Sequence, residues 1–193
     1  GKVLEKCVHT HLYNFFMYNN ILSPSQSGFI KGDSTIFQLM SIYNYFITNF
    51  DKGITTQAVF FDLSKAFDRV WHRGLLLKLE AAGVKGSLLR FIENYLFNRF
   101  QSVVVQGETS EAMPIFAGVP QGSVLGPLFF LLYINDIVND IEAVIKLFAD
   151  DTSVSLGIDN SNVRADILNA DLNKIHVWAN RWKLIFNEDK TDL

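Results

Sequence analysis

Two adjacent carboxylates, Asp150 and Asp151, stand between two runs of strand-forming residues. One run begins at residue 144, and the other continues to residue 156. Apolar and β-branched residues on both sides of a short polar pair predict a hairpin over residues 144–156, with the two acids at its turn. Because adjacent carboxylates repel each other, we expect a cation beside them, and a divalent metal ion satisfies this best.

A third carboxylate, Asp62, follows the apolar run of residues 58–61. This run predicts a buried strand over residues 57–63 with Asp62 at its C-terminal end. If the strand and the hairpin end together, Asp62 lies beside Asp150 and Asp151. Three such carboxylates suit a pair of Mg²⁺ ions about 3.5–4 Å apart, which supports in-line phosphoryl transfer. The plain alternative for the acidic pair is a solvated turn.

The elements that must position these acids are both helices and strands. Apolar residues at helical spacing predict a helix over residues 3–18, and Asp33 or Ser34 is expected to cap a second helix over residues 35–50. We expect further helices over residues 75–82, 87–97, 124–138 and 161–182, with Ser87 as the cap of the second of these. We also expect strands over residues 100–107 and 111–117, a turn over 118–123, and a short strand and loop over 183–193. This order predicts an α+β fold whose small antiparallel sheet carries helices on one face.

Composition indicates a folded domain with an uneven distribution of charge. Of the 193 residues, 49 % are hydrophobic, and the net charge is −3. Residues 1–100 carry 11 Lys and Arg against 7 Asp and Glu, which gives +4, whereas residues 101–193 carry 6 against 13, which gives −7. A net acidic chain argues against a nucleic-acid binder, but an acidic half that holds metal ions and a basic half that faces phosphates would give this asymmetry. Scattered surface charge is the alternative.

Several other kinds of site have no support in the sequence. The single cysteine, Cys7, allows no disulfide within the chain and fits a reducing compartment. The sequence contains no run of about 18 uncharged apolar residues, so we expect no membrane span. The histidines lack metal-ligand spacing and are expected at the surface or partly buried; they are His9, His11, His72 and His176.

Five stretches of the chain follow one another in a specific order. They are QSGF at residues 26–29, AVFFDLSKAFD at 58–68, GVPQGSVLGP at 118–127, LFADD at 147–151 and WKLIFNEDKT at 182–191. They resemble the successive motifs of reverse transcriptases, most closely those of jockey-like non-LTR retrotransposons of the LINE type. A single stretch would be weak evidence, but five in the family's order over nearly the whole chain are highly specific.

The resemblance implies a metal site. Asp62, Asp150 and Asp151 match the family's metal-binding aspartates, and the backbone carbonyl of Leu63 is a further expected ligand. The metals would be two Mg²⁺ ions, with Mn²⁺ as the alternative. The resemblance also implies that Lys190 lies near the leaving pyrophosphate as a general acid.

The resemblance further implies a site for the incoming dNTP. Phe67 matches the bulky aromatic residue that blocks a 2′-OH on the incoming nucleotide, and Gln121 matches the residue that packs against that nucleotide. The backbone amides of Lys65 and Ala66 are expected to face the triphosphate, as turn amides do for anions. The chain departs from the family at Ile30, where an arginine is usual, and Lys31 is the expected substitute.

The implied architecture is a right-hand polymerase with palm and helical fingers and without a thumb. We expect one incomplete domain over residues 1–193, with fingers at about 1–55 and 72–98 and palm at about 56–71 and 99–193. The expected activity is RNA-directed DNA polymerisation, in which a primer 3′-OH attacks a dNTP. RNA template, DNA primer and dNTPs would be its partners, with no membrane. The resemblance also implies a larger polypeptide with endonuclease and thumb, a nuclear working site and a cytoplasmic ribonucleoprotein stage.

Two other functions fit parts of the same pattern. A catalytically inactive, truncated remnant would only bind RNA or a protein partner. A two-metal nuclease would use the same carboxylates but would need a water-activating group, and no histidine lies near the three aspartates in sequence.

Overall fold

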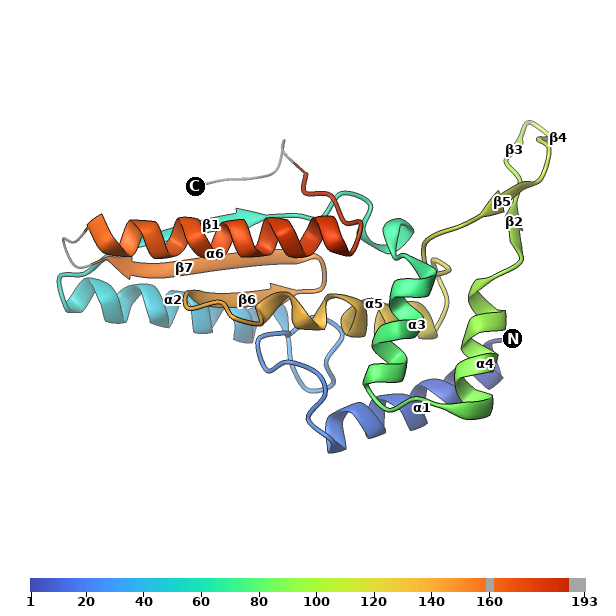
Figure 1. Cartoon of the computed structure of the whole chain (residues 1–193), viewed down its shortest axis with the longest axis horizontal. Helices are drawn as coiled ribbons and strands as arrows, with labels where there is room; N and C mark the ends of the chain where they lie inside the picture. The colour runs from blue at the N-terminus through green and yellow to red at the C-terminus, as the bar shows by residue number, and fades with distance from the viewer. Residues whose placement is uncertain (159–161, 188–193) are drawn as a thin grey trace.

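The computed structural model describes residues 1–158 and 162–187 of the chain, which form helices and short strands around one core (Figure 1). The α-helices are α1 (Lys2–Tyr18), α2 (Thr35–Asp51), α3 (His72–Ala81), α4 (Gly86–Leu96), α5 (Leu125–Ile134) and α6 (Asn162–Arg181). The strands are β1 (Thr55–Phe61), β2 (Arg99–Gln101), β3 (Val104–Val105), β4 (Glu108–Thr109), β5 (Met113–Ile115), β6 (Val144–Phe148) and β7 (Asp151–Ile158). Two 3₁₀ helices, η1 (Ala66–Arg69) and η2 (Asn135–Val138), follow β1 and α5.

The main sheet has the strand order β1-β7-β6 and is antiparallel throughout. Phe61 pairs with Thr152, and Phe148 pairs with Asp151 across a two-residue turn. This register confirms the predicted hairpin and brings the end of β1 level with the turn. Together with the mixture of helices, the sheet confirms the predicted α+β class.

One face of this sheet forms part of the hydrophobic core. Val59, Ile145 and Val154 are paired across the three strands and are all buried. Buried residues of α5 and α6 belong to the same cluster. Since α5 is apolar on every side, it suits a position inside the molecule, and nine of its ten residues are buried.

The second face of the sheet is partly covered by α2, which lies along the side of the sheet away from α6 (Figure 1). The hydroxyl of Ser34 accepts a hydrogen bond from the amide of Phe37 at 3.3 Å, so the predicted cap is confirmed. The prediction of helices on one face of the sheet is wrong in that detail, because α2 partly covers the second face. Helical spacing shows which side of a helix is apolar but not which sheet face it meets.

Four local predictions differ from the structure. His72, expected at the surface or partly buried, is only 1% exposed. The N-cap of α4 is Lys85 rather than Ser87, and no side chain caps this helix end. The helix predicted over residues 124–138 tightens to 3₁₀ geometry after Ile134. The strand predicted over residues 100–107 is broken, because Gln106 and Gly107 both have positive φ (52° and 88°) and form a tight turn between β3 and β4. Positive φ at both central residues is what a type I′ hairpin requires.

No helix among the described residues is long and apolar enough to cross a membrane. The division into fingers and palm stays a prediction.

A buried lysine, Lys78 on α3, contacts η2 through Asp136. Its ammonium group donates hydrogen bonds to the carbonyl of Tyr133 and to Asp136 Oδ1, and it lies 3.7 Å from the ring centroid of Trp182. Burial lowers the pKa of Lys78 to about 8, although Asp136 acts in the opposite direction. Protonated Lys78 is therefore less favoured in the folded protein than in the unfolded chain.

This depressed pKa predicts that stability rises with pH in the alkaline range. Between about pH 8 and the ordinary lysine pKa of 10.5, the unfolded chain binds more protons at this position than the folded protein. The free energy of unfolding should then increase by roughly 2 kcal/mol between about pH 8 and pH 10. Urea unfolding across this range measures it. Lys78→Met keeps the apolar stem and should remove the increase; equal slopes for both proteins would contradict the prediction.

Candidate functional site

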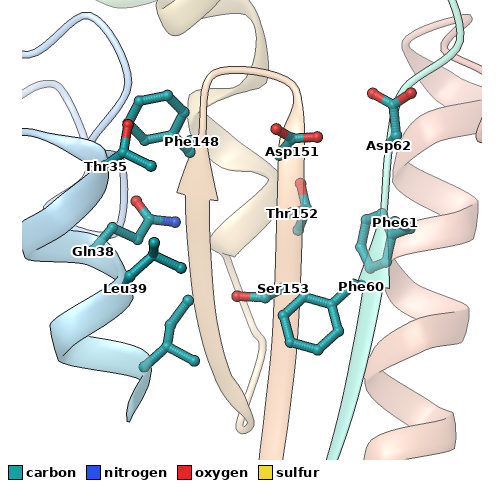
Figure 2. Close-up of a pocket in the computed structure, with 11 residues that line it drawn as sticks. Thr35, Gln38, Leu39, Phe60, Phe61, Asp62, Phe148, Asp151, Thr152 and Ser153 are labelled. Atoms are coloured by element: carbon teal, nitrogen blue, oxygen red, sulfur yellow. The ribbon is translucent and has the colours of Figure 1, made fainter. Parts of the chain in front are cut away.

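The three predicted acids lie at one end of the main sheet. Asp62 directly follows β1, Asp150 is in the β6–β7 turn, and Asp151 is the first residue of β7. Figure 2 shows the carboxylates of Asp62 and Asp151 at neighbouring strand ends, pointing in the same direction. The sheet register thus brings together acids that are almost 90 positions apart in the sequence.

A polar cavity of about 440 Å³ contains most of the predicted site. Seven of the predicted residues line it: Asp62, Leu63, Lys65, Ala66, Phe67, Gln121 and Asp150. Three residues that were not predicted complete the lining: Ser64, Asp68 and Asn187. The cavity therefore unites the segment after β1, the loop before α5 and the hairpin turn. The roles assigned to these residues stay predictions.

The segment after β1 turns sharply at Lys65, which has a left-handed backbone with a φ of 50°. Its carbonyl accepts the amides of Asp68 and Arg69, and η1 begins at Ala66. The first amides of a helix have no acceptor within the helix. The turn at Lys65 and Ala66 lies on the cavity wall, and that its amides face a triphosphate stays a prediction.

The ring of Phe67 is held between two other rings. It stacks on Phe130 of α5, with centroids 4.5 Å apart and planes at 26°, and it meets Phe29 edge-on at 6.1 Å. Aromatic pairs in these geometries stabilise beyond the area that they bury. Phe67 therefore presents a fixed, half-buried ring to the cavity.

Gln121 also lines the polar cavity, where it is hydrogen-bonded to Asp68. Its Nε2 donates to Asp68 Oδ1 at 2.9 Å, and both side chains are exposed. The loop is docked on η1 at Gly118, where a Cβ atom would lie 2.8 Å from the carbonyl oxygen of Asp68. Its φ of 89° also favours glycine. Asp68 stands in a predicted motif, but only the fold shows that it contacts Gln121.

Asn187 is a second residue that the sequence did not mark. Its amide donates to the carbonyl of Asp62 at 2.9 Å, and its Nδ2 lies 3.5 Å from Asp62 Oδ2. Leu63 and Phe186 form an antiparallel bridge beside it. Residues 186 and 187 therefore hold the segment that carries Asp62 in place. Its place in the WKLIFNEDKT stretch was the available signal.

A second hollow, of about 310 Å³, lies between α2 and the strands on the other side of the acids. Figure 2 shows Leu39, Phe60 and Phe148 around it, with Asp62 and Asp151 at one end. Among the described residues, the buried Gln38 Oε1 and Ser153 Oγ in its wall have no hydrogen-bond partner. This hollow is mostly apolar, so it is less suited to an anion than the polar cavity is.

Besides Asp151, which lines the apolar hollow instead, two predicted residues are not placed in the polar cavity in the described structure. Lys31 lines a separate hollow beside α1, and its amide donates to the hydroxyl of Tyr13 at 2.7 Å, as the chain turns towards α1 after Phe29. Ile30 lines the same hollow. Lys190 lies outside the described residues. The roles predicted for Lys31 and Lys190 are therefore without geometric support.

The acids are suitable metal ligands but do not form a closed cluster. Within residues 1–158 and 162–187, no three His, Cys, Asp or Glu side chains are close enough to hold one metal ion. Asp150 lines the polar cavity, Asp151 lines the apolar hollow, and Asp62 lines both. Consecutive residues at a turn project in different directions, and like charges separate. Two carboxylates on one polar cavity still fit Mg²⁺, which takes the rest of its ligands from water and phosphates.

Comparison with protein families gives one match across the whole chain. Residues 1–193 match the model of the reverse transcriptase (RNA-dependent DNA polymerase) family. The chain is 31% identical over 197 residues to a probable RNA-directed DNA polymerase from transposon X-element of Drosophila melanogaster, and 30% identical over 198 residues to that from mobile element jockey of the same species. These alignments cover 100% and 98% of this chain but 22% of each relative.

Solved structures support the same fold. Telomerase from Candida albicans, in complex with a fragment of telomeric RNA, matches 100% of this chain and 34% of its own, with a TM-score of 0.67 and 15% identity. Telomerase from Candida tropicalis, in a similar complex, matches 97% of this chain and 32% of its own, with a TM-score of 0.70 and 12% identity. With the ordered motifs, the sheet and the family match in agreement, the chain belongs to the reverse transcriptase family.

Proposed function

We propose that the chain is the fingers-and-palm part of an RNA-directed DNA polymerase from a jockey-like non-LTR element. The observation that carries this proposal is the polar cavity, because Asp62, Asp150, Phe67 and Gln121 all line it. An acid pair, an aromatic ring and an anion-facing turn are the parts that binding and transfer of a nucleoside triphosphate require.

The acids would hold the metal ions. Asp62, Asp150 and Asp151, with the carbonyl of Leu63, would bind two Mg²⁺ ions, or Mn²⁺ in their place. Such ions supply positive charge at the attacking and leaving oxygens of an in-line displacement. Asn187 holds Asp62 by its backbone carbonyl, so the first acid would keep its place while charges change around it.

The other cavity residues would bind and select the nucleotide. The turn at Lys65 and Ala66 would face the triphosphate, and Gln121, fixed by Asp68, would pack against the base and sugar. The ring of Phe67 would meet carbon 2′ of the sugar and exclude a hydroxyl there. The primer 3′-OH would give up its proton to water and attack the α-phosphorus, the bond from that phosphorus to the oxygen shared with the β-phosphate would break, and pyrophosphate would leave.

The wider setting is also part of the proposal. An RNA template and a DNA primer would be the macromolecular partners, and the larger size of the relatives supports a longer polypeptide with thumb and endonuclease. Copying at a chromosomal primer would place the reaction in the nucleus, after assembly of a ribonucleoprotein in the cytoplasm.

Primer extension tests the activity directly. The chain is assayed alone and in place of the matching segment of the jockey polymerase, on an RNA template with a labelled DNA primer, dNTPs and Mg²⁺. We expect dNTP-dependent extension that EDTA abolishes. If the jockey polymerase extends the primer and the exchanged protein only binds RNA, the chain is an inactive remnant. Cleavage of nucleic acid without dNTPs would instead favour a nuclease.

A further inference from the structure

The loop of residues 25–29 lies against the strand that leads into the acidic turn. The amide of Leu147 donates to the carbonyl of Ser25 at 2.8 Å, and the amide of Ser27 donates to the carbonyl of Leu147 at 2.9 Å. Gln26 and Leu147 thereby form a parallel bridge at the open edge of β6. Two segments about 120 positions apart in sequence are held together directly before Asp150.

The side chain of Gln26 then reaches over the turn itself. It is 5% exposed, and its Oε1 accepts the amide of Ala149 at 2.9 Å and that of Gly28 at 2.7 Å. Its Nε2 lies 3.4 Å from the carbonyl of Ala149. One side chain therefore contacts both backbone polar groups of the residue that precedes Asp150.

Ala149 needs such support. Its φ of 54° is in the left-handed region, which disfavours a residue with a Cβ atom. Ala149 is buried next to the loop, and a buried amide without an acceptor destabilises the fold. Without Gln26, the Ala149 peptide would turn to find another partner, and Asp150 would turn with it.

Gly28 allows the loop of residues 25–29 to lie this close to the backbone of Ala149. A Cβ atom at this position would lie 2.2 Å from the backbone nitrogen of Ala149. Phe29 follows at once and contacts the ring of Phe67 edge-on. The loop thus contacts the backbone of the acidic turn and the aromatic wall of the polar cavity at consecutive positions.

We propose that Gln26 is a positioning residue: it holds the Ala149 peptide and thereby sets the direction in which Asp150 projects into the polar cavity. The consequence for metal binding rests on the proposed function, but the hold on the turn does not. Gln26 itself contacts no reacting atom.

Amide hydrogen exchange of the 193-residue chain, followed by NMR without metal, tests the hold on the turn. Gln26→Met keeps the volume but removes both polar atoms, so exchange at Ala149 should become at least about tenfold faster. Gln26→Glu keeps an oxygen acceptor, so exchange there should stay slow. Leu96→Ala opens the core at α4 and serves as the control, because it should lower the melting temperature without selectively exposing Ala149.

A titration with Mn²⁺ alone, read by electron paramagnetic resonance, tests the consequence. Gln26→Met should weaken Mn²⁺ binding about tenfold relative to the original chain at temperatures where both are folded. The reason is that the Asp150 carboxylate would no longer be held in the direction that metal binding needs. Leu96→Ala should leave the affinity unchanged. Unchanged exchange at Ala149 in Gln26→Met, or an equal loss of affinity in the control, would overturn the proposal. If the original chain binds no Mn²⁺ while Gln26→Met still accelerates exchange, the metal site of the proposed function fails and the hold on the turn stands.

Discussion

Asp150→Asn should reduce primer extension by about 10³-fold or more if Asp150 is the proposed metal ligand, since loss of a charged ligand at the reacting phosphate removes at least ~4 kcal/mol of transition-state stabilisation. The substitution keeps the size of the side chain and the turn, so the fold should survive. Asp150 is the acid that shares the polar cavity with Asp62. Single-turnover extension in the exchanged jockey polymerase measures the effect, and circular dichroism reports the fold.

The matched control is Asp51→Asn. Asp51 is exposed at the end of α2, and it does not line the polar cavity. This variant should extend primers at the original rate. Equal rates for Asp150→Asn and the unsubstituted protein would rule out the assigned role, and so would an equal loss in both variants.

Phe67→Val should relax the choice of sugar. Shortening the ring opens space beside carbon 2′, so the ratio of kcat/KM for a ribonucleotide to that for the matching deoxyribonucleotide should rise about 10- to 100-fold. Activity with the deoxyribonucleotide should fall only modestly, because the acids are unchanged. Competition between the two nucleotides on one RNA template gives the ratio directly.

Loss of packing must be separated from loss of selection in this variant. Phe67 stacks on Phe130, so the valine leaves a gap against α5 and should lower the melting temperature. Phe100→Val, at an exposed position on β2, makes the same substitution where no nucleotide is expected. A sugar ratio that moves equally in both variants, or in neither, would contradict the role of Phe67.

The sequence predicts those parts of the site that depend on local pattern. Strand-forming runs predicted the hairpin at Asp150 and the strand before Asp62, because alternation and apolar runs are properties of neighbouring residues. That both acids reach the same end of the sheet also follows once the strands are antiparallel. The motif resemblance supplied Phe67 and Gln121, which spacing alone would leave as a core phenylalanine and a loop glutamine.

What the sequence could not predict depends on contacts between distant segments. Gln26 is an ordinary polar residue in a loop until β6 lies beside it, and Asn187 gains its place only when the chain after α6 returns to Asp62. The error at Ser87 is a shift of two residues: a serine is a good cap and would start the helix at residue 88, but α4 begins at Gly86, so Lys85 is its N-cap. The divergence of Asp150 and Asp151 likewise needed the geometry of the turn.

The polar cavity has a consequence for the gene that encodes it. Its wall is drawn from residues 62–68, Gln121, Asp150 and Asn187, so it is complete only after codon 187 has been translated. A stop codon or frameshift anywhere before that point removes at least one part of the wall, however well the earlier motifs are preserved. A copy of this sequence should therefore encode the whole cavity only where its reading frame is uninterrupted through the codon of residue 187.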